Sequence, residues 1–522
     1  MANLLHKKSI LHKTVQFGGW TLVSRFLGIL RESLQGYYLG AGAASDAFIT
    51  AYKIPNSLRK IFAEGALSAA FVPTLVQVVR QKGHKEASSL MSLAFIFFEG
   101  LVLLLCALTM WKAEFTLSLI APGFSHDQVV LGVPLLRILM PFIFFLSTSA
   151  LLAGALQSVG HFFVPAFSPV LLNLVFITGL LFCIQFGYDV TYLCFFILSG
   201  GLLQLIAHIS AYTRLHFSFA GLDRTTWQNF KPVLSKFLLG SLSMSIVEIN
   251  LFIDTSFASY LPEGSISLIY LANRFMGIPL GVFAVAFSTI LLPHLSQVSM
   301  YAPKRLSFYL LEASKLVVWV TVPVTLLMCF LSEKIFYTLF LSKKFVAAQV
   351  VEASHILIAF LVGLFFFSLN KILLNMYYAL HVAWIPALIS VIATAVNIIL
   401  NWAFMDIWHA TGLAVATTVS SIVQTIFFLI FLRQRYNFTL YVMPFLNFLM
   451  RYMVQLALVT AFFVLSYYGG VWFIATQLPA GLAHFLLYKI GFWLWVGPLC
   501  GASAFFVFYT RSWFSLNLYF LD

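Results

Sequence analysis

The residues with the most unusual chemistry in this sequence are charged side chains that occur inside apolar stretches near the N-terminus. They are Arg25, Arg31, Glu32, Asp46, Lys53, Arg59, Lys60 and Glu64. The sequence around them is as apolar as a membrane-spanning helix, for example in TLVSRFLGIL. A charge in the middle of a bilayer is costly, so it normally faces a partner or a water-filled cavity. These residues predict a polar, mainly cationic chamber inside a membrane, and an anion is the first ligand to consider.

Four arginines are the candidates for binding this anion: Arg25, Arg31, Arg59 and Arg274. The first two are separated by about 600° of helical rotation, so they lie within a third of a turn of each other in projection. A single arginine in an apolar helix often extends to the membrane surface. Four of them in two regions of the chain favour a shared cavity, where planar guanidinium groups suit the oxygens of a pyrophosphate.

The acidic residues of the same region have a different predicted task. Asp46, Glu32 and Glu64, together with Lys53, can form ion pairs that neutralise the cavity and open when the ligand arrives. Asp46 has a second interpretation, because it begins an expected helix (AASDAF), where a carboxylate caps the helix N-terminus. The two roles are compatible, and the sequence leaves both open.

A second group of polar residues suggests a cation site. Asp254 lies in an apolar segment with few bases nearby, and such a carboxylate commonly binds a cation or a proton. Asn397, Asn401 and Thr417 offer neutral oxygens in two later apolar segments. These four residues are adequate for Na⁺ in principle, whereas the alternative for the asparagines is hydrogen bonding between helices. Apart from this ion, the sequence predicts no cofactor.

Motifs for enzymatic chemistry are absent from the sequence. It contains no GxSxG elbow, no GxxxxGK[ST] loop and no HExxH motif. Its five cysteines lack the spacing of a disulfide framework or a metal site. The chain is therefore expected to be a transporter and not an enzyme.

Composition places these residues in a lipid bilayer. Of the 522 residues, 61% are hydrophobic and 9% are charged. Because a span needs roughly 20 apolar residues, the apolar runs predict about fourteen transmembrane helices. They are expected near 14–40, 43–79, 88–111, 131–157, 162–186, 190–213, 233–261, 266–298, 310–332, 350–379, 383–407, 410–432, 449–471 and 486–510. The expected fold class is an all-α polytopic membrane protein.

The net charge of +13 is better explained by membrane topology than by nucleic-acid binding. Basic residues gather in alternate loops, for example Arg80, Lys82 and Lys85 after the second helix and Arg433 and Arg435 after the twelfth. This positive-inside pattern places both termini in the cytoplasm. Membrane lipids are the expected surroundings, and no nucleic-acid partner is expected.

An internal repeat relates two parts of the chain. Residues 45–75 align with 265–295 at an offset of 220, and 157–177 align with 378–398 at an offset of 221. A nearly constant offset over such a distance predicts two homologous helical bundles. Repeats of even helix number have the same orientation in the membrane, form a central cleft and alternate its access by rocking against each other.

The repeat gives the predicted domain organisation. Residues 1–220 and 221–435 are expected to form two pseudo-symmetric six-helix bundles, and residues 436–522 two accessory transmembrane helices.

Three runs of the sequence resemble the MurJ/MviN family of lipid II flippases, which act in bacterial cell-wall synthesis. They are SRFLGILRESLQGYYLGAGAASDAFITAYKIPNSLRKIFAEGALSAAFVPTL, GALQSVGHFFVPAFSPVLLNLVFI and DTSFASYLPEGSISLIYLANRFMGIPLGVFAVAFSTILLPHLSQ. The resemblance covers about residues 10–435 and includes charged as well as apolar positions. The tail is similar to the family only in its hydropathy.

The resemblance implies a fourteen-helix transporter of the multidrug/oligosaccharidyl-lipid/polysaccharide exporter superfamily, located in the bacterial inner membrane. Its cargo would be lipid II, the undecaprenyl-diphosphate-linked disaccharide-pentapeptide, moved to the outer leaflet by alternating access. Other cell-wall synthesis proteins would be candidate partners. The positions that match the family's central cavity and head-group site are Arg25, Arg31, Asp46, Arg59 and Arg274.

The resemblance also implies a sodium region and two departures from the family pattern. Asp254, Asn397, Asn401 and Thr417 match a region that some members use for sodium. Asn401 stands where sodium-site members carry an acid, so this region has lost a charge. Gly277 stands where some members carry an acid that can bridge the two halves.

Three alternative functions compete with this interpretation. An exporter of another polyprenyl-diphosphate-linked glycan would need the same cationic cavity. A drug exporter of the same superfamily would be expected to use acids for cationic cargo, whereas this cavity is predicted to be net basic. A non-transporting scaffold for cell-wall enzymes would not require arginines inside the membrane in both halves.

Overall fold

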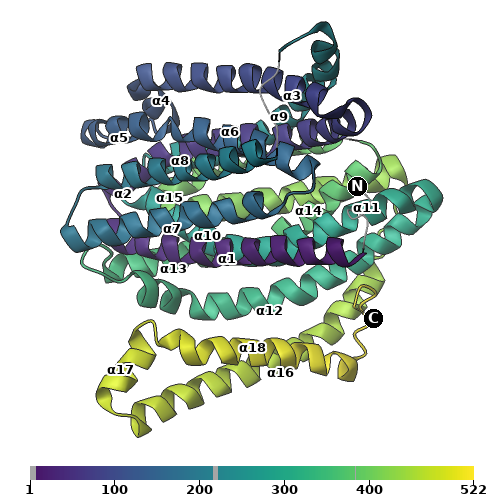
Figure 1. The fold of residues 1–522 in the computed structure, drawn as a ribbon. Helices are drawn as coiled ribbons and strands as arrows, with labels where there is room; N and C mark the ends of the chain where they lie inside the picture. The colour runs from purple at the N-terminus through teal and green to yellow at the C-terminus, as the bar shows by residue number, and fades with distance from the viewer. Residues whose placement is uncertain (1–6, 216–220, 383, 522) are drawn as a thin grey trace. The chain divides into compact units, whose positions relative to one another are not determined.

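The computed structural model describes residues 7–215, 221–382 and 384–521. Within these ranges every regular element is a helix, and no strand occurs. The chain divides into two compact units, residues 1–267 and 268–522. The predicted all-α fold class is confirmed (Figure 1).

The first unit is a bundle of long helices (Figure 1). Its elements are α1 (Lys7–Leu39), α2 (Ala43–Arg59), the π-helix η2 (Lys60–Gly65), α3 (Ala66–Trp111), α4 (Ala113–Ile120), α5 (His126–Leu139), α6 (Phe142–Ser158), α7 (Phe163–Phe186), α8 (Val190–Arg214) and α9 (Arg224–Ala258). Helix α3 packs against α6 and α9, and α7 packs against α1 and α8. Aromatic side chains fill these contacts, as where Phe98 of α3 meets Phe230 and Phe237 of α9.

The second unit begins within α10 and continues to the C-terminal residues. Its elements are α10 (Ser265–Pro279), the π-helix η3 (Leu280–Val285), α11 (Ala286–Tyr301), η4 (Pro303–Arg305), α12 (Leu306–Phe340), α13 (Ala347–Val362), α14 (Leu364–Ala379), α15 (Trp384–Tyr436), α16 (Val442–Gln477), α17 (Ala480–Tyr488), α18 (Phe492–Thr510) and η5 (Arg511–Phe514). Helix α14 packs against α11, α12 and α15, so it forms the centre of this unit.

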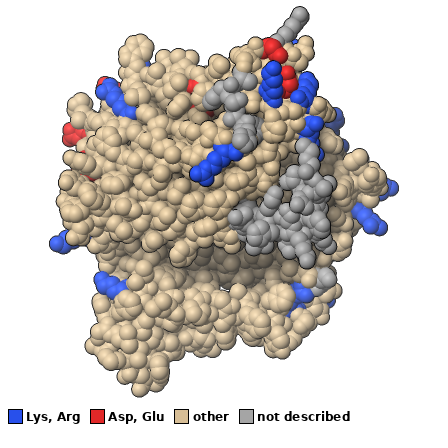
Figure 2. All heavy atoms as spheres, in the orientation of Figure 1, with Lys and Arg blue, Asp and Glu red and all other residues tan. Residues whose placement is uncertain are grey.

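Nine helices among the described residues are long and apolar enough to cross a bilayer, or up to ten if the bent pair α13 and α14 counts as one span. Two of the nine, of 42 and 53 residues, are long enough for two crossings, because a helix rises about 1.5 Å per residue and the hydrocarbon core is about 30 Å thick. These two are broken, α3 at Gly83 (φ 87°) and α15 at His409 (φ 47°), so each supplies two consecutive spans. The order of helices is consistent with the fourteen predicted spans, and uncharged residues dominate the visible face (Figure 2).

Matching elements recur along the chain at the offset seen in the sequence. The π-helical turn at Lys60–Gly65 is followed 220 residues later by the one at Leu280–Val285. The paired helices α5 and α6 correspond in order and length to α13 and α14. These elements support the repeat, while the domain boundaries at residues 220 and 435 stay predictions.

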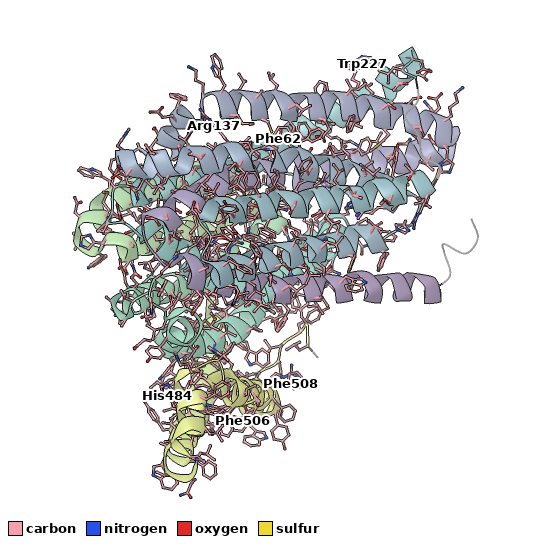
Figure 3. The ribbon with its side chains drawn as sticks, turned by 60° about the vertical axis from the view of Figure 1, so that its left-hand side comes forward. Phe62, Arg137, Trp227, His484, Phe506 and Phe508 are labelled. Atoms are coloured by element: carbon pink, nitrogen blue, oxygen red, sulfur yellow. The ribbon has the colours of Figure 1, made fainter. Side chains whose placement is uncertain are left out.

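The C-terminal helices α16 and α18 lie side by side and are joined through α17 (Figures 1 and 3). Neutral hydrogen bonds connect them with α12 and with each other. The Trp319 indole of α12 donates to the side-chain oxygen of Gln455 on α16 at 3.2 Å. The Gln455 amide donates to the Val507 carbonyl of α18 at 2.6 Å. Phe506, labelled in Figure 3, packs against Phe462 with ring centroids 4.9 Å apart. Polar atoms of the accessory helices are thus satisfied inside the protein, as lipid requires.

Candidate functional site

Arg31 is held in a polar cluster between α1 and α7. One terminal nitrogen donates to the Asn173 side-chain oxygen at 3.0 Å, and the other contacts a Glu32 carboxylate oxygen at 2.6 Å. The guanidinium lies over the Phe176 ring, 5.0 Å from its centroid, and the Asn173 amide donates back to Ser24 on α1. The side chains of the pair are only 13% and 10% exposed. Arg31 is therefore fixed in orientation and partly neutralised in this conformation.

Arg25 lies on the same helix but in a different environment. Its side chain is exposed, and among the described residues no hydrogen-bond or ion-pair partner is found for it. Helix α1 thus carries one guanidinium that is held by protein groups and a second that is accessible about two turns away. This arrangement suits a ligand that binds the accessible cation first.

Two lysines of the first unit face helix α9. The Lys53 ammonium donates to the Leu251 carbonyl at 2.6 Å and also to the Thr255 hydroxyl. The Lys60 ammonium forms an ion pair with the Glu248 carboxylate at 2.9 Å. The predicted membership of Lys53 in a gate of ion pairs stays a prediction. The lysines join α2 and η2 to α9 through polar contacts that lipid cannot replace.

Asp46 joins α2 to the start of α10. It is 2% exposed, and its two carboxylate oxygens accept hydrogen bonds from the backbone amides of Gly264 at 2.7 Å and Ser267 at 2.8 Å. The Ser267 hydroxyl donates to the same carboxylate at 2.5 Å. The carboxylate therefore satisfies amide groups at a helix N-terminus, where negative charge is favoured. We call the contacts of Asp46 with Gly264 and Ser267 the Asp46 clasp.

The Asp46 clasp has partners that the sequence did not identify. The carboxylate bonds to α10 and not to an arginine among the described residues, and it does not cap its own helix. The N-cap position of α2 is Gly42, and Asp46 lies a full turn inside the helix, so its side chain projects toward the neighbouring element. A role as a gate stays a prediction.

Close backbone approach surrounds the Asp46 clasp. Gly264 has φ of 95°, and a Cβ atom there would lie 2.8 Å from the Ala41 carbonyl oxygen. The Gly123 amide donates to the Ser259 hydroxyl at 2.9 Å, and a Cβ atom at Gly123 would lie 2.6 Å from the Ser259 backbone. Only glycine fits these two positions without displacement. The segment between α9 and α10 is therefore closely packed against the rest of the first unit.

The remaining predicted basic residues occur in two different surroundings. Arg59, at the end of α2, donates to the Asn56 side-chain oxygen at 3.0 and 3.2 Å. Arg274 is exposed in the second unit, donates to the Tyr270 hydroxyl at 3.0 Å and stacks over its ring. The Glu64 side chain lies outside the described part of the chain. Arg31 and Glu32 therefore lie together in the first unit, whereas Arg274 belongs to the second unit.

The neutral residues of the predicted sodium site form a chain of hydrogen bonds. The Asn401 amide donates to the Asn397 side-chain oxygen at 3.1 Å, and the Asn397 amide donates to the Thr417 hydroxyl at 3.4 Å. The Thr417 hydroxyl donates to the Leu413 carbonyl at 2.9 Å. Asp254 lies in the first unit. N–H groups thus point at the Asn397 and Thr417 oxygens, and a sodium site formed by these residues stays a prediction.

Two polar residues of this network were missed from the sequence. Asn173 orients Arg31, and Glu248 pairs with Lys60. The spacing along the chain gave a signal for Glu248, because Lys53 and Lys60 are two helical turns apart on one face. Glu248 and Thr255 have the same spacing on α9.

Comparison with known proteins agrees with this architecture. The family model described as lipid II flippase MurJ matches residues 36–489. The chain belongs to the MurJ lipid II flippase family. It is accordingly a transporter and not an enzyme. The match also extends beyond residue 435, so the family likeness includes much of the tail, where the sequence had suggested a likeness in hydropathy alone.

Individual MurJ relatives are similar over most of their length. A probable lipid II flippase of Buchnera aphidicola subsp. Acyrthosiphon pisum is 30% identical over 90% of this chain and 92% of its own. The lipid II flippase of Burkholderia cenocepacia is 31% identical over 80% and 82%.

Solved structures show the same fold. A MurJ lipid II flippase in an inward closed conformation has a TM-score of 0.74 and 25% identity over 95% of this chain and 99% of that one. An inward-facing multidrug resistance MATE transporter has a TM-score of 0.67 at 15% identity, covering 78% and 94%, which shows a shared fold alone.

The Asp46 clasp predicts that Asp46→Asn weakens the attachment of α2 to α10. Asparagine keeps the size of the side chain but replaces a charge-assisted acceptor, worth about 1.5–3 kcal/mol. We expect a cysteine placed at the buried Ser265 to become roughly tenfold or more easier to label in this variant. Asp127→Asn, on the exposed first turn of α5, serves as the control. Equal labelling of Ser265→Cys with and without Asp46→Asn would contradict the prediction.

Proposed function

We propose that this chain moves lipid II from the cytoplasmic to the outer leaflet by alternating access, with its pyrophosphate bound by Arg25, Arg31, Arg59 and Arg274. Membership of the MurJ family supports the cargo. The main support for the binding role is a contrast between two arginines of α1. Arg25 is exposed, whereas Arg31 forms an ion pair with Glu32. We place the protein in the bacterial cytoplasmic membrane with both termini inside, as the positive-inside pattern predicts.

The cluster around Arg31 supports an exchange of anions. Glu32 now neutralises the guanidinium at 2.6 Å, while Asn173 holds its orientation. A pyrophosphate has more charge and more acceptor oxygens than a single carboxylate, so it competes for the same nitrogens in bidentate geometry. Glu32 then acts as the counter-ion of the empty site, and Arg25 as the cation that first meets the cargo. A desolvated guanidinium never lacks an anionic partner in this scheme.

The Asp46 clasp also supports the proposed alternating access. Its bonds connect α2 with the first turn of α10 through one carboxylate and two backbone amides. Such bonds can break and be replaced by water when a passage opens, because each is worth only about 1–3 kcal/mol net. We propose that the clasp closes the passage in the conformation described and opens in the alternative one. Lys53 and Lys60, which bond to α9, stay attached in this scheme.

Arginine substitutions test the binding role. We expect Arg25→Ala to reduce lipid II translocation in reconstituted vesicles roughly tenfold to a hundredfold, because one charge-assisted contact is worth about 1.5–3 kcal/mol. Arg25→Lys is expected to retain part of the activity, since it keeps the charge but loses the planar fork. Translocation is measured by the access of labelled lipid II to an enzyme added outside the vesicles.

The matched control is Arg137→Ala in the same unit. Arg137, labelled in Figure 3, is exposed and donates to the Met110 carbonyl, so its loss should leave translocation unchanged. Normal translocation by both Arg25→Ala and Arg274→Ala, with normal membrane insertion, would contradict the proposal. A polyprenyl diphosphate with a different glycan, tested in the same vesicles, decides between lipid II and the alternative cargo.

For the cation region we propose that translocation does not depend on sodium. The hydrogen bonds among Asn397, Asn401 and Thr417 support this, because N–H groups engage the Asn397 and Thr417 oxygens that would bind the ion. We expect equal rates with and without a sodium gradient in the wild type and in Asp254→Ala. Asn401→Asp supplies a carboxylate and is expected to introduce sodium dependence. A sodium-dependent rate in the wild type that disappears in Asp254→Ala would contradict the proposal.

A further inference from the structure

A buried acid in the first unit is not used by the function proposed above. Glu99 lies on α3 within a segment apolar enough to span the membrane, and its side chain is 2% exposed. The Ser147 hydroxyl on α6 donates to one carboxylate oxygen at 2.7 Å. The other oxygen is buried and has no hydrogen-bond partner, and the same is true of the hydroxyl of Thr148, the next residue on α6. Thr148 still lies close enough to interact with the Glu99 carboxyl group, so α6 presents two hydroxyl groups to this acid inside the membrane.

The surroundings of Glu99 lack a compensating charge. Helix α6 carries no titratable side chain, and Lys231 and Lys236 of α9 are exposed. No ion pair between Glu99 and a basic residue is found among the described residues. On α3 itself, Cys106 lies two turns away on the same face, and its thiol donates to the Met140 carbonyl. The carboxylate of Glu248, which also lies on α9, forms an ion pair with Lys60. An ionised, unpaired carboxylate would be very costly here, so the group holds a proton.

A path of hydroxyl groups leads toward Glu99 along the same face of α3. Ser88 and Ser92 are buried, and their spacing of four and then seven residues to Glu99 keeps all three within about 40° in projection. This stripe starts close to the Gly83 break, where Lys85 is exposed. Ser92 donates to the Ser88 carbonyl at 2.9 Å. A distance of about 10 Å along the helix separates Ser92 from Glu99, so a proton can pass only if water enters between the helices.

We propose that Glu99 is an intramembrane proton-binding site whose loading and release are coupled to the separation of α3 from α6. In the conformation described, the carboxylic acid is sealed by Ser147 and by the contact of Phe98 with Phe237. When α3 and α6 separate, water reaches the O–H group, accepts its proton and solvates the carboxylate that remains. Return to the closed packing requires the proton to be taken up again. The coupling to lipid translocation rests on the proposed flippase function, whereas the proton site itself does not.

Infrared spectroscopy of the full chain in vesicles tests the proton site. At neutral pH we expect a carbonyl band of a protonated carboxylic acid that is lost in Glu99→Gln. The matched control is Glu312→Gln, which removes a buried acid that forms an ion pair with Lys315 at 2.6 Å. Its band pattern in this region should equal that of the wild type. Persistence of the protonated band in Glu99→Gln would overturn the proposal, whether or not the vesicles translocate lipid.

A second measurement tests the coupling. We expect the wild-type translocation rate to change when a pH difference is imposed across the vesicle membrane, and the rate of Glu99→Gln to be the same with and without it. Glutamine can keep the hydrogen bond to Ser147, so a purely structural role would leave the pH response intact. An unchanged response in Glu99→Gln, or no response in the wild type, would overturn the coupling. Absence of translocation by the wild type both with and without the pH difference would contradict the proposed function, and the infrared result would still decide the proton site.

Discussion

A charged or polar group inside a bilayer must find its partner within the protein, and most features of this structure follow from that constraint. Arg31 is supported by a carboxylate, an amide and an aromatic ring at once. Lys53 and Lys60 are supported by oxygens of α9. In each case the partner comes from a different helix or from the adjacent residue. The charges that a transporter needs for its cargo therefore also determine which helices stay together.

The second unit also meets this constraint with networks of neutral groups. The Asn370 amide donates to the Ser421 carbonyl at 3.0 Å and to the Gln424 side-chain oxygen at 3.1 Å, and the Thr425 hydroxyl donates to the Asn370 oxygen at 2.7 Å. These bonds connect α14 with the second half of α15. Neutral networks carry no net charge to desolvate, so they suit permanent packing between helices. The chain of hydrogen bonds from Asn401 to Thr417 belongs to the same type.

Much of the fold could be predicted from the sequence, because apolar length and charge-free runs determine where a helix can span a bilayer. The breaks at Gly83 and His409 fall between predicted spans, and the two π-helices recur at the repeat offset. For the candidate site, the sequence predicts which types of residue belong there but not which residues contact each other. Arg31 is expected near other polar groups, because a charged side chain is costly in lipid. The choice of Asn173 as its partner depends on how α1 packs against α7. Distances across helices are not encoded in spacing along one of them.

Asp46 illustrates why the physical role of a residue can differ from the obvious local one. Its position near the start of a helix favours a cap on that helix, yet Gly42 holds the cap position and the carboxylate reaches the amides of α10. A bond to backbone amides has an advantage over an ion pair with an arginine. When it breaks, it leaves N–H groups that water can satisfy, and no uncompensated guanidinium remains in a low-dielectric region. Bonds of this kind can break at moderate cost, because water can replace them.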